Sequence, residues 1–321
     1  MAENFYPLYP YGKLDIQSEA ILRQIAESNE EPLSNLTPQQ ARETFFEKSW
    51  LGITDEKVII TNFHVEDSGI EIPLRVYTPH GKERYPVLLF FHGGGFVVGA
   101  LDEFDALCTY MAEGAGCIVV SVGYRLAPEN KYPAALHDAL VALEWVGNNA
   151  SNIKGDASRI AVAGDSAGAN LAAVTSLIAR DKALPKLLCQ VLICPWVDLL
   201  STDRDSYKYF GEGLWLSTAN IYWYRNHYLN NIEEAKSYMV SPMQAENLSG
   251  LPPAIIIAAE YDVLRDEAKL YAERLAATSV PVKYSEYKGM LHDFVTLPGL
   301  FDRATEAINE INETLKFYFN D

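Results

Sequence analysis

A serine flanked by small residues lies where an apolar strand is expected to turn into a helix. Residues 164–168 read GDSAG, follow the apolar run RIAVA and precede the helix-like run ANLAAVTSLIA. A strand-turn-helix elbow exposes its serine at the carboxyl edge of a sheet, and small neighbours let other backbone approach the tight turn. The helix N-terminus also places partial positive charge near the hydroxyl. The pattern therefore predicts Ser166 as a nucleophile.

Three consecutive glycines follow another apolar run, PVLLFF, in residues 92–96, which read HGGGF. Glycines at a strand end usually mark a bend or a flexible loop. Next to a nucleophile, such a loop can also turn amide N–H groups toward an oxyanion, and each donor is typically worth about 2.7–4 kcal/mol in the transition state. We expect Gly94, Gly95 and Ala167 to supply these amides. We expect His92 to brace the loop by hydrogen bonding.

A serine hydroxyl needs a base that takes its proton, and His292 is the candidate that best fits this role. It lies in GMLHDF, residues 289–294, directly after the strand-like run VKYSEY. Loops beyond the carboxyl ends of strands are where such sheets place their chemistry. The other five histidines have plainer interpretations. His64 and His80 are interpreted as surface groups, and His92 as a brace of the glycine loop. His137 lies within a helical pattern well before the serine, and His227 lies in an aromatic-rich segment, where it would pack or face a substrate.

An acid must hold the imidazole in the required tautomer and stabilise its charged form. In the chain order expected here, this acid falls between the serine and the histidine. Asp262 is our choice because it lies in the loop directly after the apolar run PAIIIAA. Glu260 is the nearest rival and Asp198 a weaker one, whereas Asp266 fits the N-cap of the next helix.

The elements that must position these residues alternate along the chain. The runs PVLLFFH, CIVVSVG, RIAVAGD, LLCQVLIC and PAIIIAA are almost wholly apolar, as in strands that helices cover on both faces. Earlier in the chain, an Asp-Ser-Gly turn lies between the β-branched runs KVIITNFHV and IEIPLRVYTP. This pattern predicts an antiparallel hairpin. We predict the α/β class, with a mostly parallel sheet flanked by helices. Helical patterns occur at residues 134–147, 167–180, 266–277 and 302–318.

Two segments fall outside this alternation, and we expect them to form a helical cap. Residues 1–49 contain helix-like stretches at 18–28 and 38–48, and the alternation breaks again at 200–250. Within this insert, positions 207–228 hold eight aromatic residues. A satellite cluster that only packs on the core is the alternative, but inserts in α/β folds often carry function. The remaining segments, 50–199 and 251–321, would form the catalytic core. The expected pocket residues are Phe96, Phe210, Trp215 and Tyr222.

Composition excludes several classes of partner. The chain has 26 lysines and arginines against 43 aspartates and glutamates, a net charge of −17, which repels nucleic acid and anionic lipid. No apolar run is long enough for a membrane span, and the N-terminus lacks the regions of a secretory signal. The four cysteines, which form no C-x-x-C pair, are interpreted as structural thiols of a cytoplasmic protein. Neither they nor the histidines show ligand spacing, so we expect no metal. A homodimer is one state that the sequence allows.

Taken together, several segments resemble the hormone-sensitive-lipase-like esterases of the α/β-hydrolase superfamily. They are LLFFHGGGFVVG, YRLAPENKYPAALHDAL, VAGDSAGANLAA, EYDVLRDEA and GMLHDF, which span about residues 87–294. The resemblance implies an α/β-hydrolase fold with a cap, and the roles given above for the serine, acid, histidine and three amides. It also implies that Asp165 helps to order the site and that YRLAPE forms a supporting loop.

The resemblance further implies hydrolysis of short-chain carboxylic esters through an acyl-enzyme, without a cofactor. Ala169 replaces a glycine that is common in the family, which a helix tolerates, and Val263 replaces a usual proline, which leaves the acid loop less constrained. Two alternatives stay open. An amidase, peptidase or lactonase would use the same residues, and a non-catalytic small-molecule receptor would keep the pocket. Receptors that resemble this family lack the catalytic histidine, whereas His292 is present here.

Overall fold

The computed structural model of this chain describes residues 13–28, 30–48, 58–182 and 184–320. The expectation about the first twelve residues and the boundary proposed near residue 50 lie outside this part of the chain. No helix within the described part combines the length and the apolar composition that a bilayer crossing requires.

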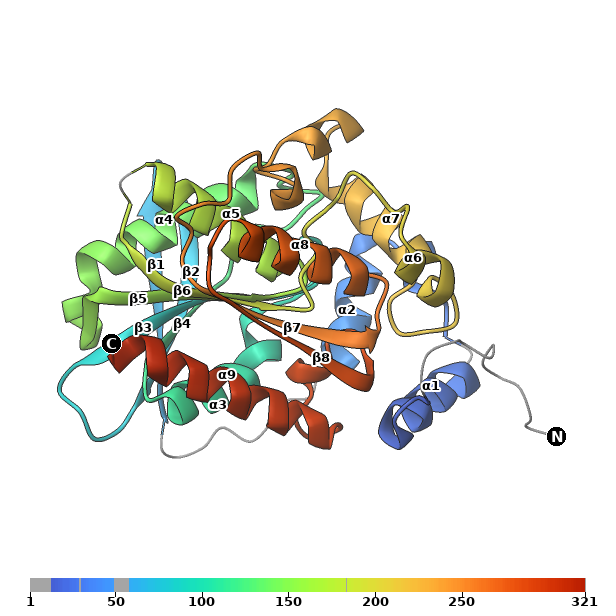
Figure 1. Ribbon diagram of the computed structural model, residues 1–321, viewed down its shortest axis with the longest axis horizontal. Helices are drawn as coiled ribbons and strands as arrows, with labels where there is room; N and C mark the ends of the chain where they lie inside the picture. Colours follow the sequence, from blue (N-terminus) through green and yellow to red (C-terminus); the bar gives the residue numbers. More distant parts are fainter. Residues whose placement is uncertain (1–12, 29, 49–57, 183, 321) are drawn as a thin grey trace.

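The described strands form one eight-stranded sheet in the order β1-β2-β4-β3-β5-β6-β7-β8 (Figure 1). β1 pairs with β2 and β2 with β4 in antiparallel fashion, and every later pairing is parallel. The predicted hairpin and the mostly parallel sheet are both confirmed. The strands are β1 Val58–Asp67, β2 Ile70–Pro79, β3 Tyr85–Phe91, β4 Ile118–Val122, β5 Gly155–Asp165, β6 Leu187–Ile193, β7 Ala254–Tyr261 and β8 Val282–Leu291.

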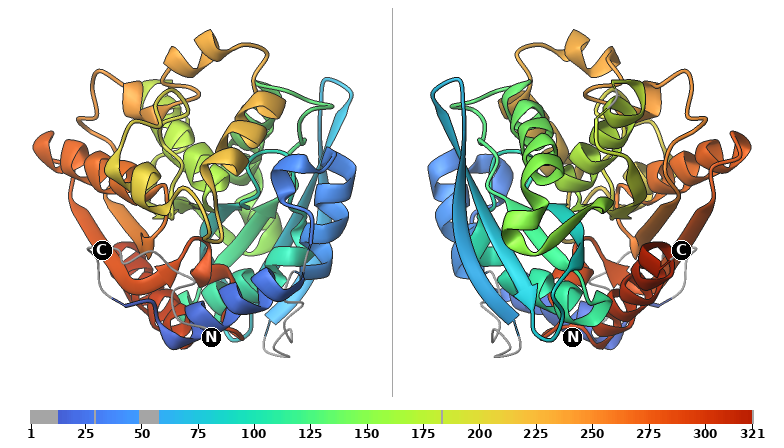
Figure 2. Two further views of the ribbon diagram at one scale, coloured as in Figure 1. Left: turned by 90° about the vertical axis from the view of Figure 1, so that its right-hand side faces the viewer. Right: turned by 90° about the vertical axis from the view of Figure 1, so that its left-hand side faces the viewer.

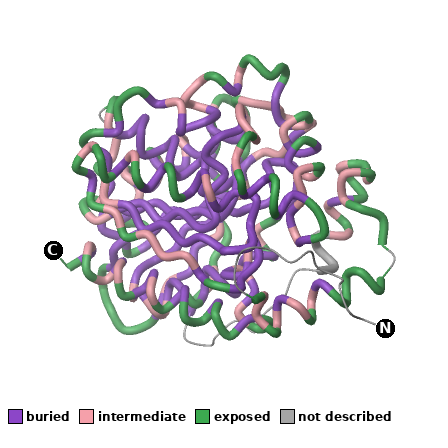
Figure 3. Tube along the Cα trace, turned by 45° about the vertical axis from the view of Figure 1, so that its right-hand side comes forward, coloured by how far each residue is buried: buried purple, intermediate pink, exposed green. Residues whose placement is uncertain are grey.

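The central strands are apolar throughout because helices cover both faces of the sheet, and successive side chains of a strand point to opposite faces. In β3, Leu89 and Phe91 join one hydrophobic core, while Leu88 and Phe90 join the other. Figures 1 and 2 show the two helical layers, and Figure 3 shows how completely they bury the strands. The first layer holds α4 Ala134–Asn149, α5 Ala167–Asp181 and α8 Arg265–Ala277; the second holds α3 Asp105–Ala115 and α9 Asp302–Asn320.

The four helices expected in the core are confirmed, with one correction at the start of α8. This helix begins at Arg265, so Asp266 lies in its first turn and is not its N-cap. The Asp266 carboxylate is instead engaged by two other groups: it accepts hydrogen bonds from the backbone amide of Ser206 at 2.8 Å and from the guanidinium of Arg265 at 2.8 and 2.7 Å.

Four further helices lie together at one end of the molecule, beside the carboxyl ends of β7 and β8 (Figure 1). The two predicted near the N-terminus are confirmed as α1, Ile16–Ser28, and α2, Pro38–Lys48; the insert forms α6, Asp205–Phe210, and α7, Thr218–Tyr228. The indole N–H of Trp223 in α7 donates to the carbonyl of Leu36 at 3.1 Å. This bond ties the insert to the segment that leads into α2.

Candidate active site

Ser166 occupies the one-residue turn between β5 and α5. Its backbone has φ 53° and ψ −112°, a conformation that costs a non-glycine residue about 1–3 kcal/mol. The Ser166 amide donates to the carbonyl of Ile193 at 2.8 Å, which secures the turn to β6. A Cβ atom on Gly164 would lie 2.1 Å from the Gly168 carbonyl oxygen, and one on Gly168 would lie 2.0 Å from that of Phe91. The predicted close approach of backbone therefore occurs at both glycines.

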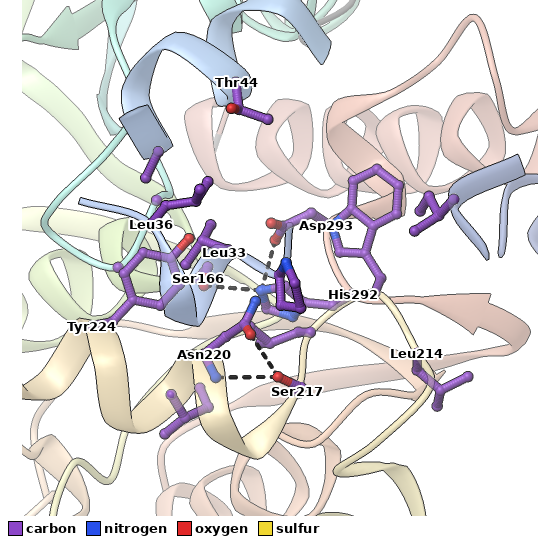
Figure 4. Close-up of a pocket in the computed structure, with 18 of the residues that line it drawn as sticks. Leu33, Leu36, Thr44, Ser166, Leu214, Ser217, Asn220, Tyr224, His292 and Asp293 are labelled. Carbon is purple, nitrogen blue, oxygen red and sulfur yellow. Dashed lines mark hydrogen bonds and ion pairs between the residues drawn. The ribbon is translucent and has the colours of Figure 1, made fainter. Parts of the chain in front are cut away.

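The structure brings Ser166, His292 and Asp262 into a continuous line of contacts. Figure 4 shows the contact between Ser166 and His292. His292 Nε2 lies 3.0 Å from Ser166 Oγ, and its Nδ1 lies 2.7 Å from Asp262 Oδ2. The other carboxylate oxygen of Asp262 accepts a hydrogen bond from the Leu264 amide at 2.9 Å. All three side chains are buried. With Nδ1 protonated toward Asp262, Nε2 is free to accept the serine proton.

The surroundings of His292 favour its charged form. Burial alone lowers the pKa of an imidazole, but the carboxylates of Asp262 and Asp293 outweigh burial and raise the pKa of His292 well above its ordinary value. Cys194 and Tyr224 also lie near this group. Burial raises the pKa of the Cys194 thiol to about 12 and that of the Tyr224 phenol above its ordinary value, so both stay neutral at neutral pH.

The glycine loop has a backbone conformation that few other residues adopt. Gly94 and Gly95 have φ of 105° and 59°, which favour glycine. The amides of Val97 and Val98 donate to the Gly94 carbonyl at 3.0 and 2.9 Å. No described residue accepts a hydrogen bond from the amide of Gly94, Gly95 or Ala167, and Ala167 opens α5, where amides have no partner within the helix. Gly94 and Gly95 line the same cavity as Ser166, and the role of the three amides as oxyanion donors stays a prediction.

His92 makes three contacts at the glycine loop, which support its expected role as a brace. Its Nδ1 lies 2.7 Å from the carbonyl oxygen of Gly93, and its ring stacks on Tyr124 with centroids 4.2 Å apart. The Tyr124 hydroxyl donates to the His92 carbonyl at 2.8 Å. Burial lowers the pKa of His92 to about 4, so the ring is neutral and Nδ1–H donates to Gly93.

Asp165 is buried beside the loop, and neither of its carboxylate oxygens has a hydrogen-bond partner among the described residues. A Cβ atom on Gly93 would lie 2.3 Å from its Oδ2, so the first glycine of the loop makes room for this carboxyl. Burial raises the pKa of Asp165 well above its ordinary value, and the negative charge of Asp293 raises it further. The group therefore keeps its proton. Its expected role in ordering the site stays a prediction.

A cavity of about 390 Å³ opens onto Ser166 and His292. Its walls come from three parts of the chain: the core, the segment around α1 and α2, and the insert around α7. The apolar lining includes Ile25, Leu33, Leu36, Ala41, Trp196, Leu214, Trp215, Leu216 and Ile221. Its acidic lining is Glu30, Glu31, Glu103 and Asp293, and no lysine or arginine of the described chain lines it.

Of the four residues expected to line the pocket, the structure brings only Trp215 to this cavity. Phe96 is fully buried and stacks on Tyr228, with ring centroids 3.8 Å apart. Phe210 packs inward against Tyr261 at 5.3 Å. Tyr222 faces outward, with its hydroxyl 2.9 Å from Thr202 Oγ1. These three residues belong to the packing of the insert and do not line the cavity.

The rival acids are engaged elsewhere. Glu260 Oε2 accepts the Gly289 amide at 2.8 Å, and Asp198 pairs with Arg204. The site also contains residues that the sequence analysis did not assign, above all Tyr224 and Asp293. The aromatic insert was a signal for Tyr224, whereas Asp293 stood within a quoted motif without a role.

A thiol, a carboxylate and an imidazole of the type that binds metals also meet here. The ligand atoms of Cys194, Asp262 and His292 lie within 4.8 Å of one another, although these residues are far apart in the chain. Their donors are already engaged, because the imidazole contacts Asp262 and Ser166, and Cys194 is a neutral thiol. The donor set therefore fits proton transfer better than metal binding.

The fold and the geometry of this site define a member of the α/β-hydrolases. The profile of the α/β hydrolase fold family matches residues 88–296, which is more than half of the chain. The chain therefore belongs to this family, which includes the hormone-sensitive-lipase-like esterases. The fold class and the family resemblance predicted from the sequence are confirmed.

Relatives of known type point in the same direction. The chain is similar to carboxylic ester hydrolase LipN of Mycobacterium tuberculosis, with 38% identity over 82% of this chain and 71% of the relative. It is 34% identical to an ethyl acetate hydrolase of Pseudomonas putida, over 89% of this chain and 92% of the relative. Its structure matches a hyperthermophilic esterase from the archaeon Pyrobaculum calidifontis with TM-score 0.89 and 36% identity, covering 95% and 98% of the two chains.

Proposed function

We propose that this protein is a serine carboxylesterase that hydrolyses short-chain carboxylic esters through an acyl-enzyme on Ser166. The carboxylic ester hydrolase class rests on the family and on relatives that are named esterases. The observation that carries the mechanism is the line of contacts from Ser166 to His292 at 3.0 Å and on to Asp262 at 2.7 Å. Ser166 and His292 line a cavity together with Gly94 and Gly95, and the amides of Gly94, Gly95 and Ala167 have no backbone acceptor among the described residues.

In the first half of the reaction, Ser166 Oγ bonds to the ester carbonyl carbon while His292 Nε2 takes the hydroxyl proton. The carbonyl oxygen becomes an oxyanion, which the amides of Gly94, Gly95 and Ala167 stabilise. The bond to the alcohol oxygen then breaks, and Nε2–H passes its proton to the leaving alcohol. In the second half, water attacks the acyl-serine and gives a proton to Nε2. The acid leaves as Ser166 recovers its hydroxyl proton.

The cavity supports small esters as substrates. At about 390 Å³ it lies near the lower end of the range of about 300–1,000 Å³ that small-molecule sites occupy, and its lining is mostly apolar. We further propose that segments 1–49 and 200–250 act as a cap over the core segments 50–199 and 251–321. The wall contributed by Leu33, Leu36 and Leu216 supports this division.

The decisive test is Ser166→Ala. We expect kcat on p-nitrophenyl acetate to fall by about 10⁴-fold or more, as removal of a nucleophile does in known triads. A fluorophosphonate should label the wild type and not the variant. Near wild-type turnover in Ser166→Ala contradicts the proposal, and a wild type that neither turns over nor labels favours the non-catalytic receptor.

Two further measurements define the reaction. Rates on an ester and an amide of the same acyl group separate an esterase from an amidase, and a series of p-nitrophenyl esters from two to twelve carbons gives the acyl preference.

We also propose a cytoplasmic location, which the four buried, unpaired cysteines support, and cell fractionation tests it. Light scattering would show whether the chain forms the homodimer that the sequence allows.

A further inference from the structure

We propose that Asp293 is a second carboxylate partner of His292, on the side that faces Ser166, and that it competes with the serine for the catalytic proton. This inference rests on the proposed function, because it concerns the base of that reaction. Asp293 would act through His292 as a positioning residue. It would set the pH at which the base becomes active.

The backbone directs Asp293 toward the imidazole. Residue 293 has φ 60° and ψ 11°, the left-handed conformation that aspartate and asparagine adopt more readily than most residues. Asp293 Oδ1 lies 2.9 Å from His292 Nε2, as near as the Ser166 hydroxyl at 3.0 Å. Figure 4 shows both oxygens at the same end of the ring. One nitrogen therefore has two oxygen neighbours.

The carboxylate oxygen of Asp293 that lies near Nε2 has no other hydrogen-bond donor among the described residues. Asp293 Oδ1 is buried, and no described residue gives it a hydrogen bond. A buried acceptor without a partner is costly, and Nε2 of His292, at 2.9 Å, is within hydrogen-bond distance. When the imidazole is charged, Nε2–H can donate to Asp293 while Nδ1–H donates to Asp262. When the imidazole is neutral and active, Nε2 carries no proton and cannot donate a hydrogen bond to Asp293. Asp293 therefore stabilises the form that cannot activate Ser166.

The other titratable groups that face His292 are neutral, so they do not replace the negative charge of Asp262 and Asp293. Cys194 follows β6 and Tyr224 lies on α7, and both stay neutral for the reason given above. Asp165, at the end of β5, has a raised pKa because of burial and of the charge on Asp293. Asp262 and Asp293 are thus the two carboxylates that hold the imidazolium, and Asp165 is a protonated neighbour that can ionise if the charge on Asp293 is removed.

The test is the pH profile of kcat/KM on a neutral p-nitrophenyl ester, compared between the wild type and Asp293→Asn. Asparagine keeps the left-handed conformation and the size of the side chain but carries no charge. A protonated His292 cannot take the serine proton, so kcat/KM falls on the acid side of the profile, here called the acid limb. Loss of the Asp293 charge lowers the pKa of His292 and therefore moves the acid limb to lower pH. We expect a shift of at least one pH unit. Below the wild-type limb the variant should be about tenfold faster, since one pH unit is a tenfold change in the neutral fraction.

Two companion variants make the result decisive. Asp165→Asn/Asp293→Asn prevents Asp165 from replacing the lost charge, so its limb should move at least as far. Glu260→Gln removes a carboxylate that accepts the Gly289 amide at 2.8 Å and makes no contact with His292, and it should leave the acid limb in place. The inference is overturned if the acid limb stays in place in both Asp293→Asn and the double variant, even when their rates fall uniformly, or if Glu260→Gln moves it instead. Full activity in Ser166→Ala would instead overturn the proposed function itself.

Discussion

Replacing Asp262 with asparagine tests the orientation of the base, because the structure dictates how the new side chain must lie. The Leu264 amide donates to Asp262 Oδ1 at 2.9 Å. The NH₂ group of an asparagine cannot accept this bond, so the side-chain oxygen must take the position of Oδ1. Its NH₂ group then points at His292 Nδ1, which faces the other carboxylate oxygen at 2.7 Å. The imidazole is forced into the tautomer with hydrogen on Nε2.

This tautomer cannot take the Ser166 proton. The same change in a serine-protease triad lowers kcat by about 10⁴-fold, equivalent to about 5.4 kcal/mol at 1.36 kcal/mol per tenfold change. We expect a loss of this order in kcat for Asp262→Asn on p-nitrophenyl acetate at neutral pH. The fold should persist, because the asparagine keeps both hydrogen bonds.

A matched control is Glu260→Gln, the nearest rival in sequence. Glu260 accepts the Gly289 amide at 2.8 Å and the Lys288 ammonium at 3.2 Å and makes no contact with His292. Glutamine can accept the same amide, so we expect kcat to stay within tenfold of the wild type. The reasoning is refuted if Asp262→Asn stays within tenfold while its melting temperature is unchanged, or if Glu260→Gln shows the larger loss.

The remaining predictions concern the walls of the site. Gly95→Ala should lower kcat/KM by about 10²-fold or more, because its Cβ would lie 2.2 Å from the Tyr224 ring and would displace one oxyanion donor; kinetics and a melting curve separate loss of activity from loss of fold. The acidic lining should select against anionic esters, so p-nitrophenyl hemisuccinate should react at least about tenfold more slowly than the butyrate, since like charges within a few ångströms repel by more than 1 kcal/mol. The discrimination should grow as pH rises through about 7, where Glu103 ionises, and equal rates at all pH values would contradict it.

Most of the fold could be predicted because sheet strands that helices cover on both faces are apolar at every position. Helix α3 is the exception. It contains Gly114, and a glycine inside a helical pattern weakens the signal by which a helix is predicted. In the structure this glycine makes room for the neighbouring helix, because a Cβ atom on Gly114 would lie 2.0 Å from Asn312 Nδ2 in α9. A contact between residues so far apart in sequence cannot be seen in a local pattern.

The motif residues of the site could be predicted for a related reason. Ser166, the glycine loop, Asp262 and His292 all follow strands, and parallel strands bring their carboxyl ends to one edge of the sheet. The pocket walls follow no such rule. The insert is rich in aromatic residues, but which of them faces the cavity depends on how α7 packs. Trp215 lies at the cavity, whereas Tyr222, four positions into α7, faces outward.

The two site residues that the sequence analysis did not assign, Tyr224 and Asp293, lie at the site because of where their side chains point. Tyr224 reaches the glycine loop because Gly95 has no side chain to exclude its ring, so the glycine at this position also shapes the pocket wall. Asp293 contacts Nε2 because its backbone is left-handed; in a β conformation the same carboxylate would point elsewhere. The contact of Asp293 depends on a backbone conformation that an aspartate can adopt but that its residue type does not dictate. The presence of an acidic residue directly after His292 therefore becomes informative only once the conformation of the turn that carries it is known.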